Sequence, residues 1–219
     1  APEQAPNDPE HISIEFTKGI PTRLIVPATG KEYTDACDVF LELNALARKH
    51  GIGRVDIVEN RFIGVKSRGC YESPGATILR AAHIDLEGLT LDREALEVNV
   101  RRIRDQIVTT KLSEILYYGF FFSPESQYVR SCIPPSQLTV NGTVKLKLYK
   151  GHVSIEGRSS DELLYDEKFS SMDELGGFEP EETSGFISVQ SIRLKRFGLG
   201  LAHRGMAGAD PKKAYALPQ

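Results

Sequence analysis

A strict alternation of apolar and polar residues on either side of Lys150-Gly151 constrains the fold of this chain most strongly. The two segments are TVKLKLY, residues 143–149, and HVSIEGR, residues 152–158. Side chains of a β-strand point alternately to its two faces, so this pattern is typical of strands with one buried face. A turn-forming pair between two such segments predicts an antiparallel β-hairpin.

A second hairpin is predicted near the amino end, and helical periodicity follows it. HISIEF and TRLIV alternate in the same way around residues 18–21. After Thr34 and Asp35, either of which can serve as N-cap, helical spacing connects Val39, Phe40, Leu43, Leu46 and Ala47. After Ser73-Pro74 the same spacing connects Ile78, Leu79, Ala82 and Leu86. The predicted fold class is α+β, with a large mixed, mainly antiparallel β-sheet packed with helices.

Cap residues predict three more helices, which begin near residues 90–92, at Ser123 and at Thr183-Ser184. The sequence YYGFFF, residues 117–122, precedes the second of these helices. So much aromatic area is rarely left in water, and we expect this cluster in the core or at a contact between subunits.

Composition and charge favour a protein that handles small molecules. The formal net charge of −3 and the pI near 6.0 give no electrostatic reason to expect a nucleic acid or an anionic membrane as partner. No run approaches the roughly 20 apolar residues that span a bilayer, and the opening APEQAPNDPE does not resemble a signal peptide. A soluble, cytoplasmic protein is therefore expected.

The cysteines and histidines predict neither a metal site nor a catalytic pair. Cys37, Cys70 and Cys132 are widely separated and form no CxxC motif, which favours free thiols in a reducing compartment. A catalytic role for Cys70 is disfavoured because no histidine is an obvious partner. His83 lies one residue from the apolar stripe of its helix, and we expect a hydrogen-bonded structural residue rather than a catalytic one.

The segment GIGRVDIVENRFIGVKSRGCYESPG, residues 51–75, is the strongest candidate for a functional site. It combines glycines, carboxylates and a basic cluster between two helical patterns. The sequence predicts a turn-rich loop in which Val55 and Ile57 belong to a short buried strand that ends at Glu59. On composition alone, a ligand site and an internally paired ion network are equally favoured.

The order of residues in this segment is more informative than their kinds. The string VENRFIGVKSRGCYESPG, residues 58–75, continues into TIL and AAHIDLE. It resembles the signature of the argininosuccinate synthase family, the ATP-dependent ligases that join citrulline to aspartate in arginine biosynthesis and the urea cycle. The resemblance extends from about His11 through GFFFSPESQYVRSCI to FISVQSIRLK, and it covers only the second half of the family's chain. It implies the carboxyl-terminal synthetase and oligomerisation domain.

This resemblance implies roles for individual residues. Glu59 and Tyr71 correspond to residues that contact citrulline: a carboxylate suits its α-ammonium group, and a phenol can hydrogen-bond a polar end. Arg61, Lys66 and Arg68 are expected to support the loop through ion pairs. Whether one of them touches substrate or nucleotide stays open. No catalytic residue is expected in this chain.

The family binds nucleotide with a pyrophosphate loop of the form SGGLDTS. Neither this loop nor a GxxxxGK[ST] motif occurs in the sequence. The resemblance therefore implies that Mg-dependent ATP belongs to a missing nucleotide-binding half, that this chain binds no cofactor or metal, and that it is inactive alone. The implied partners are citrulline, the missing half and further copies of the chain in a homotetramer.

Three segments are expected along the chain. Residues 1–9 are predicted to form a Pro-rich linker, residues 10–197 the synthetase domain, and residues 198–219 a tail or oligomerisation arm. A Pro-rich opening directly before a strand fits a fragment better than a natural amino terminus. The alternative is a stand-alone, non-catalytic module that binds an amino acid or oligomerises without a ligase partner.

Overall fold

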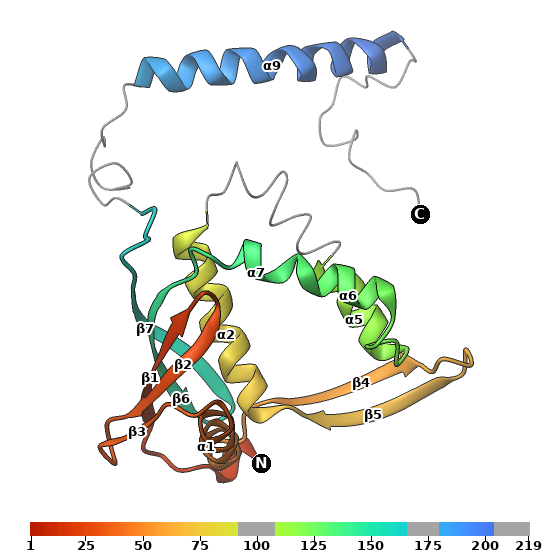
Figure 1. The fold of residues 1–219 in the computed structure, drawn as a ribbon. Coiled ribbons are helices and arrows are strands. Elements are labelled where there is room, and N and C mark those ends of the chain that lie inside the picture. Colours follow the sequence, from red (N-terminus) through yellow and green to blue (C-terminus); the bar gives the residue numbers. More distant parts are fainter. Residues whose placement is uncertain (92–107, 166–179, 204–219) are drawn as a thin grey trace. The chain divides into compact units, whose positions relative to one another are not determined.

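The structure is a computed structural model, and it describes residues 1–91, 108–165 and 180–203 (Figure 1). The chain forms two compact units, residues 1–164 and residues 165–219. All the described strands, and every described helix except one, belong to the first unit.

A five-stranded antiparallel sheet with the order β3-β2-β1-β6-β7 forms the centre of the first unit. β1 pairs with β6 in a register that places Ile14 opposite Val144, so strands far apart in the sequence are neighbours. The α+β class and both predicted hairpins are confirmed, and every strand pair within the described residues is antiparallel. The strands are β1 (Glu10–Thr17), β2 (Ile20–Val26), β3 (Lys31–Tyr33), β6 (Gly142–Tyr149) and β7 (His152–Ser159).

Two-residue turns close the β1–β2 and β6–β7 hairpins of this sheet. Lys18 and Gly19 have φ values of 51° and 73°, and Lys150 and Gly151 have values of 40° and 87°. Positive φ at both central residues is the geometry of a type I′ turn, whose twist matches that of the flanking strands. The two lysines therefore hold a left-handed conformation that the paired strands impose on them.

Helices α1 (Ala36–Lys49) and α2 (Pro74–Thr90) pack against each other, and α2 also packs on β6 and β7. Asp35 is the N-cap of α1, and its carboxylate accepts hydrogen bonds from two backbone N–H groups of the first turn. Gly51 follows the end of α1 with a φ of 69°. Ser73 precedes α2 as predicted, although its side chain makes no capping hydrogen bond.

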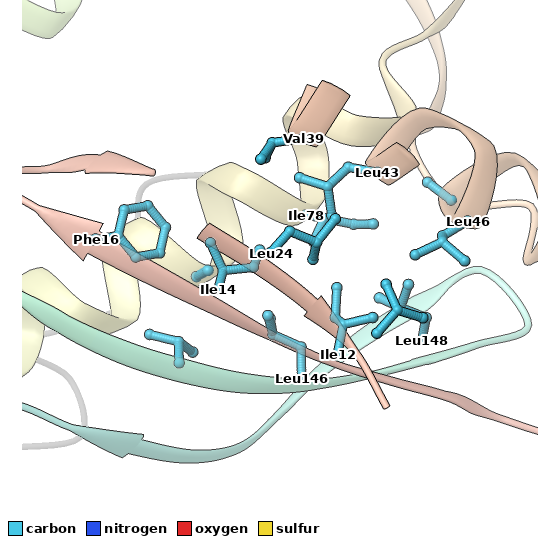
Figure 2. Close-up of a cluster of buried hydrophobic side chains, with 14 of the residues drawn as sticks. Ile12, Ile14, Phe16, Leu24, Val39, Leu43, Leu46, Ile78, Leu146 and Leu148 are labelled. Atoms are coloured by element: carbon cyan, nitrogen blue, oxygen red, sulfur yellow. The ribbon is translucent and has the colours of Figure 1, made fainter. Parts of the chain in front are cut away.

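The core lies between one face of the sheet and the facing sides of α1 and α2 (Figure 2). Spacing of two residues in the strands and of three or four in the helices places these residues on one face of each element. Burying one such aliphatic side chain stabilises the fold by about 1.5–3 kcal/mol. The sheet contributes Ile12, Ile14, Leu146 and Leu148, and the helices contribute Val39, Leu43, Leu46 and Ile78.

β4 (Arg54–Asn60) and β5 (Lys66–Glu72) form a separate two-stranded antiparallel sheet (Figure 1). The predicted strand through Val55 and Ile57 is present as β4, but the predictions that it is buried and that the rest of the segment is a loop are wrong. Val55 and Ile57 are 51% and 39% exposed, because the described residues leave the apolar side chains of β4 largely uncovered. The alternation in β4 is typical of a strand. β5 could not be predicted in this way, because it has no apolar alternation and contains a glycine and charged residues.

A second, smaller apolar cluster lies around α5 (Thr110–Tyr117), α6 (Pro124–Ser131) and the one-turn helix α7 (Ile133–Ser136). Ser123 caps α6 as predicted, because its hydroxyl accepts a hydrogen bond from the N–H of Ser126. The cluster consists of Val108, Ile115 and Val129, with Leu112, Cys132 and Ile133 packed against them.

The aromatic run at residues 117–122 contributes little to this cluster. Its five aromatic side chains are between 38% and 93% exposed. The prediction that they belong to the core is wrong for the described part of the chain. Their role at a contact between subunits stays a prediction.

Helix α9 (Pro180–His203) is the described element of the second unit. Its presence confirms the helix predicted through residues 186–194. The helix begins before the expected caps Thr183 and Ser184, and it continues past residue 197.

Two other predictions concern the chain outside these elements. The helix expected from residues 90–92 onward falls mainly outside the described residues, as does the end of the expected tail. The expected linker at residues 1–9 contains one 3₁₀ turn, η1 (Pro2–Gln4). Among the helices that the structure describes, none combines the length and the apolar character needed to cross a membrane.

Candidate functional site

The register of the β4–β5 hairpin decides which side chains share a face. Glu59 lies opposite Ser67, and Tyr71 lies opposite Val55. One cross-strand pair separates these two pairs on the same face, because facing residues alternate along both strands. Glu59 and Tyr71 are therefore on one face of the hairpin and lean toward each other along it.

Glu59 and Tyr71 are in direct contact. The Tyr71 hydroxyl donates a hydrogen bond to Oε1 of Glu59. This bond to a carboxylate, followed by partial burial, raises the pKa of the Tyr71 phenol above its usual value, because ionised tyrosine could not donate. The Glu59 side chain is 21% exposed, so the carboxylate is shielded but reachable from solvent. The two residues singled out for citrulline thus lie together.

Arg61 lies at the start of the turn between the strands and points back to the same face. Its Nη2 donates a hydrogen bond of 3.2 Å to Oγ of Ser67, and its Nη1 lies 3.7 Å from Oε1 of Glu59. The turn is closed by hydrogen bonds from the N–H of Arg61 to the carbonyl of Val65 and from the N–H of Gly64 to the carbonyl of Arg61, both of 2.8 Å. A positive charge therefore lies beside the Glu59 carboxylate.

The opposite face of the hairpin carries an ion network. Nε and Nη2 of Arg68 donate to Oδ1 and Oδ2 of Asp56 at 2.9 and 2.6 Å. This guanidinium lowers the pKa of Asp56. Nζ of Lys66 donates to Oδ1 of Asn60 at 3.0 Å. Lys66 and Arg68 thus hold the two strands together on the face away from Glu59, and Arg61 is the basic residue of the three that lies on the face of the candidate site.

Tyr117 at the end of α5 is a contributor that the sequence analysis did not assign to the site. Its hydroxyl donates a hydrogen bond of 2.8 Å to the carbonyl of Asn60, the residue after Glu59. Next to it, the rings of Phe62 and Tyr118 meet edge to face at 5.4 Å. These contacts attach α5 to the tip of the hairpin. The aromatic run was the available signal, but it gave no indication of which segment it contacts.

His83 lies away from this hairpin and is hydrogen-bonded, as predicted. Its Nε2 lies 2.9 Å from Oε1 of Gln137, and Nε2 of Gln137 donates to Oε1 of Glu87 at 2.9 Å. The three side chains line a cavity of about 620 Å³ between α2, α5 and α7. Within the described residues, no group of three His, Cys, Asp or Glu side chains could hold a metal ion. The three cysteines are free thiols.

Comparison with known proteins gives this hairpin its context. A family model described as "Arginosuccinate synthase C-terminal domain" matches residues 1–197. The chain belongs to the argininosuccinate synthase family. It is 55% identical over 195 residues to argininosuccinate synthase of Schizosaccharomyces pombe, covering 89% of the chain and 46% of that relative. The corresponding identities are 52% over 202 residues for the Saccharomyces cerevisiae protein and 46% over 196 residues for the human protein, each over 90% of the chain.

The chain spans about half the length of the argininosuccinate synthases that it matches, with coverage of 46% or 47% of each relative. The signature string of the family, residues 58–75, coincides with the end of β4, the turn, β5 and the start of α2. In this member of the argininosuccinate synthase family, the signature is therefore a β-hairpin with a hydrogen-bonded acid and phenol on one face.

Proposed function

We propose that the chain provides part of the citrulline site of an ATP-dependent ligase that condenses citrulline with aspartate to argininosuccinate, AMP and pyrophosphate. Glu59 binds the α-ammonium group of citrulline, and the Tyr71 phenol hydrogen-bonds a polar end while its ring limits the pocket. Arg61, Lys66 and Arg68 stabilise the hairpin that carries both. The role belongs to arginine biosynthesis and the urea cycle, in the cytoplasm.

The contact between Glu59 and Tyr71 is the observation that carries this proposal. Within the described residues, both the hydrogen bond from Tyr71 and the ion pair with Arg61 use Oε1 of Glu59. A carboxylate offers about four lone-pair positions on its two oxygens. Oε2 is therefore left to accept a hydrogen bond from an ammonium group, and the phenol oxygen can still accept one.

The contribution of this chain to the reaction is positioning. Holding two reactants in attack geometry can supply about 7–11 kcal/mol of the barrier without any general base on the chain. The sequence contains neither an SGGLDTS nor a GxxxxGK[ST] segment, which supports a site for Mg-dependent ATP outside this chain. ATP belongs to a nucleotide-binding half supplied by another part of the enzyme. The exposed aromatic run and the tail serve contacts within a homotetramer.

A reconstitution experiment tests the proposal. The chain is mixed with the separately expressed amino-terminal half of the Schizosaccharomyces pombe relative, and AMP release is measured. We expect release that depends on citrulline and aspartate in the mixture, and none from either part alone. Calorimetry should detect no ATP binding to the chain alone. ATP binding with micromolar affinity, or AMP release without the second half, would contradict the assignment of the nucleotide site.

A further inference from the structure

Gly69, at the centre of β5, has no conformational reason to be glycine. Its φ lies outside the left-handed range that excludes other residues. Glycine in the interior of a strand weakens the strand, because it loses more backbone entropy on folding and offers no side chain to pack. A strand glycine with ordinary backbone geometry often marks a place where another group approaches closely.

The group that approaches Gly69 is the ring of Tyr71. A Cβ atom added at Gly69 would lie 2.5 Å from Cε2, 2.6 Å from Cζ and 2.7 Å from the hydroxyl oxygen of Tyr71. Cβ atoms in real structures essentially never come so near to other atoms. The hydroxyl end of the Tyr71 ring therefore occupies the space that a side chain at position 69 would need. In the register, Gly69 pairs with Ile57, between the pair that contains Tyr71 and the pair that contains Glu59.

We propose that Gly69 is a positioning residue, whose missing side chain lets the Tyr71 ring lie along the hairpin so that its hydroxyl reaches Glu59. Any side chain at position 69 lifts the ring from the strand and separates the phenol from the carboxylate. The geometric part of this inference concerns the hairpin alone, whereas its consequence for citrulline rests on the proposed function.

The chain offers a matched control for a substitution at this position. Gly157 in β7 is also a strand glycine with φ outside the left-handed range, and a Cβ added there would meet no atom within 4 Å. Gly157→Ala thus makes the same chemical change in the same kind of element without touching an aromatic ring.

The first test measures the Tyr71 phenol directly, on the chain labelled with ¹³C at Cζ of tyrosine. Tyr71→Ala identifies the resonance by its disappearance. Gly69→Ala should lower the pKa of Tyr71 toward its ordinary value, because the hydrogen bond to Glu59 is lost, and Gly157→Ala should leave it unchanged. An unchanged Tyr71 pKa in Gly69→Ala would overturn the inference.

The second test uses the reconstituted enzyme and separates this inference from the proposed function. Gly69→Ala should raise the citrulline KM about five-fold, because the displaced Tyr71 phenol loses one hydrogen bond to an uncharged group of citrulline. The KM for ATP should stay unchanged. In a Tyr71→Ala background the same substitution should add almost nothing to KM or to the loss of stability, because no ring remains to be displaced. Additive effects would refute the positioning role, even if Gly69→Ala alone destabilises the hairpin.

The two hypotheses fail in different ways. If Glu59→Gln and Tyr71→Ala leave the citrulline KM unchanged, the proposed function fails while the pKa result for Gly69 still stands. If both raise KM and Gly69→Ala does not, the positioning role fails while the proposed function stands.

Discussion

Glu59→Gln is the most selective perturbation of the candidate site. Glutamine has the shape of glutamate, and its amide oxygen can still accept the hydrogen bond that Tyr71 donates to Oε1. The geometry of the pair is therefore retained while the negative charge is removed. An ammonium group of a bound amino acid then loses its charged acceptor.

The size of the effect follows from the surroundings of Glu59. A hydrogen bond to a charged group contributes about 1.5–3 kcal/mol, which corresponds to about 10- to 150-fold in affinity. Nη1 of Arg61 lies 3.7 Å from the same carboxylate, and the Glu59 side chain is 21% exposed, so a competing charge and water both weaken the pairing with a ligand. We therefore expect the lower part of this range, a rise of about 10- to 30-fold in the citrulline KM.

The assay is AMP release by the reconstituted enzyme at varied citrulline. We expect Glu59 to bind the ammonium group equally in the ground state and in the transition state. The KM for citrulline should therefore rise, while kcat and the KM for ATP change little. Glu72→Gln is the matched control: it removes one exposed carboxylate from the same hairpin, where Glu72 pairs with Arg54 at 3.0 Å. A citrulline KM that stays the same in Glu59→Gln, or rises equally in Glu72→Gln, would refute the reasoning.

Three further predictions concern the fold. Leu146 is fully buried, and Leu146→Ala should lower the free energy of unfolding, measured in urea, by about 2–5 kcal/mol. Leu41 is 59% exposed, and Leu41→Ala should change it by less than about 0.5 kcal/mol. Equal losses would contradict the described core. His50 is fully buried, neither ring nitrogen has a hydrogen-bond partner among the described residues, and burial lowers its pKa below 6.5. As the pH falls below 6.5, the unfolded chain therefore binds a proton before the folded chain does, and the free energy of unfolding should fall. Urea titrations at several pH values should show a smaller dependence of the free energy of unfolding on pH in His50→Leu. The same pH dependence in both proteins would disprove the burial argument. The hydrogen bonds from Arg68 lower the pKa of Asp56 below 3.8, so their stabilisation is present above that value and is lost as the pH falls through the lowered pKa. Arg68→Gln should raise the pKa of Asp56 in an NMR titration, and an unchanged pKa would rule out the pairing.

The β1–β2 and β6–β7 hairpins of the large sheet could be predicted from the sequence, because each has one face toward the core and the other toward water. Such a sheet forces apolar and polar residues to alternate, as residues 142–149 do around Val144, Leu146 and Leu148. The pairing of β1 with β6 could not be predicted in the same way. Alternation identifies the buried face of a strand but not the partner along its edge, and the two strands lie more than a hundred residues apart.

The hairpin of the candidate site escaped prediction for the opposite reason. Neither β4 nor β5 has a face packed in the core, so burial imposed no regular pattern on residues 66–72. The aromatic run at residues 117–122 led to the converse error. Its apolar area predicted burial in the core or between subunits, whereas the described residues leave its aromatic side chains largely exposed. The contact of Tyr117 with Asn60 depends on tertiary structure alone.

Resemblance to the family singled out Glu59 and Tyr71 as candidate site residues, but their proximity depends on the register of the hairpin. Five residues, 61–65, connect β4 to β5, and within them Gly64 has a φ of 82°. A shift of register by one residue would place Glu59 opposite Lys66 or Arg68 instead of Ser67, and Tyr71 would move to the other face. The family motif in the sequence identifies Glu59 and Tyr71 as candidates. The length and closure of the turn, together with the open position at Gly69, determine that they meet.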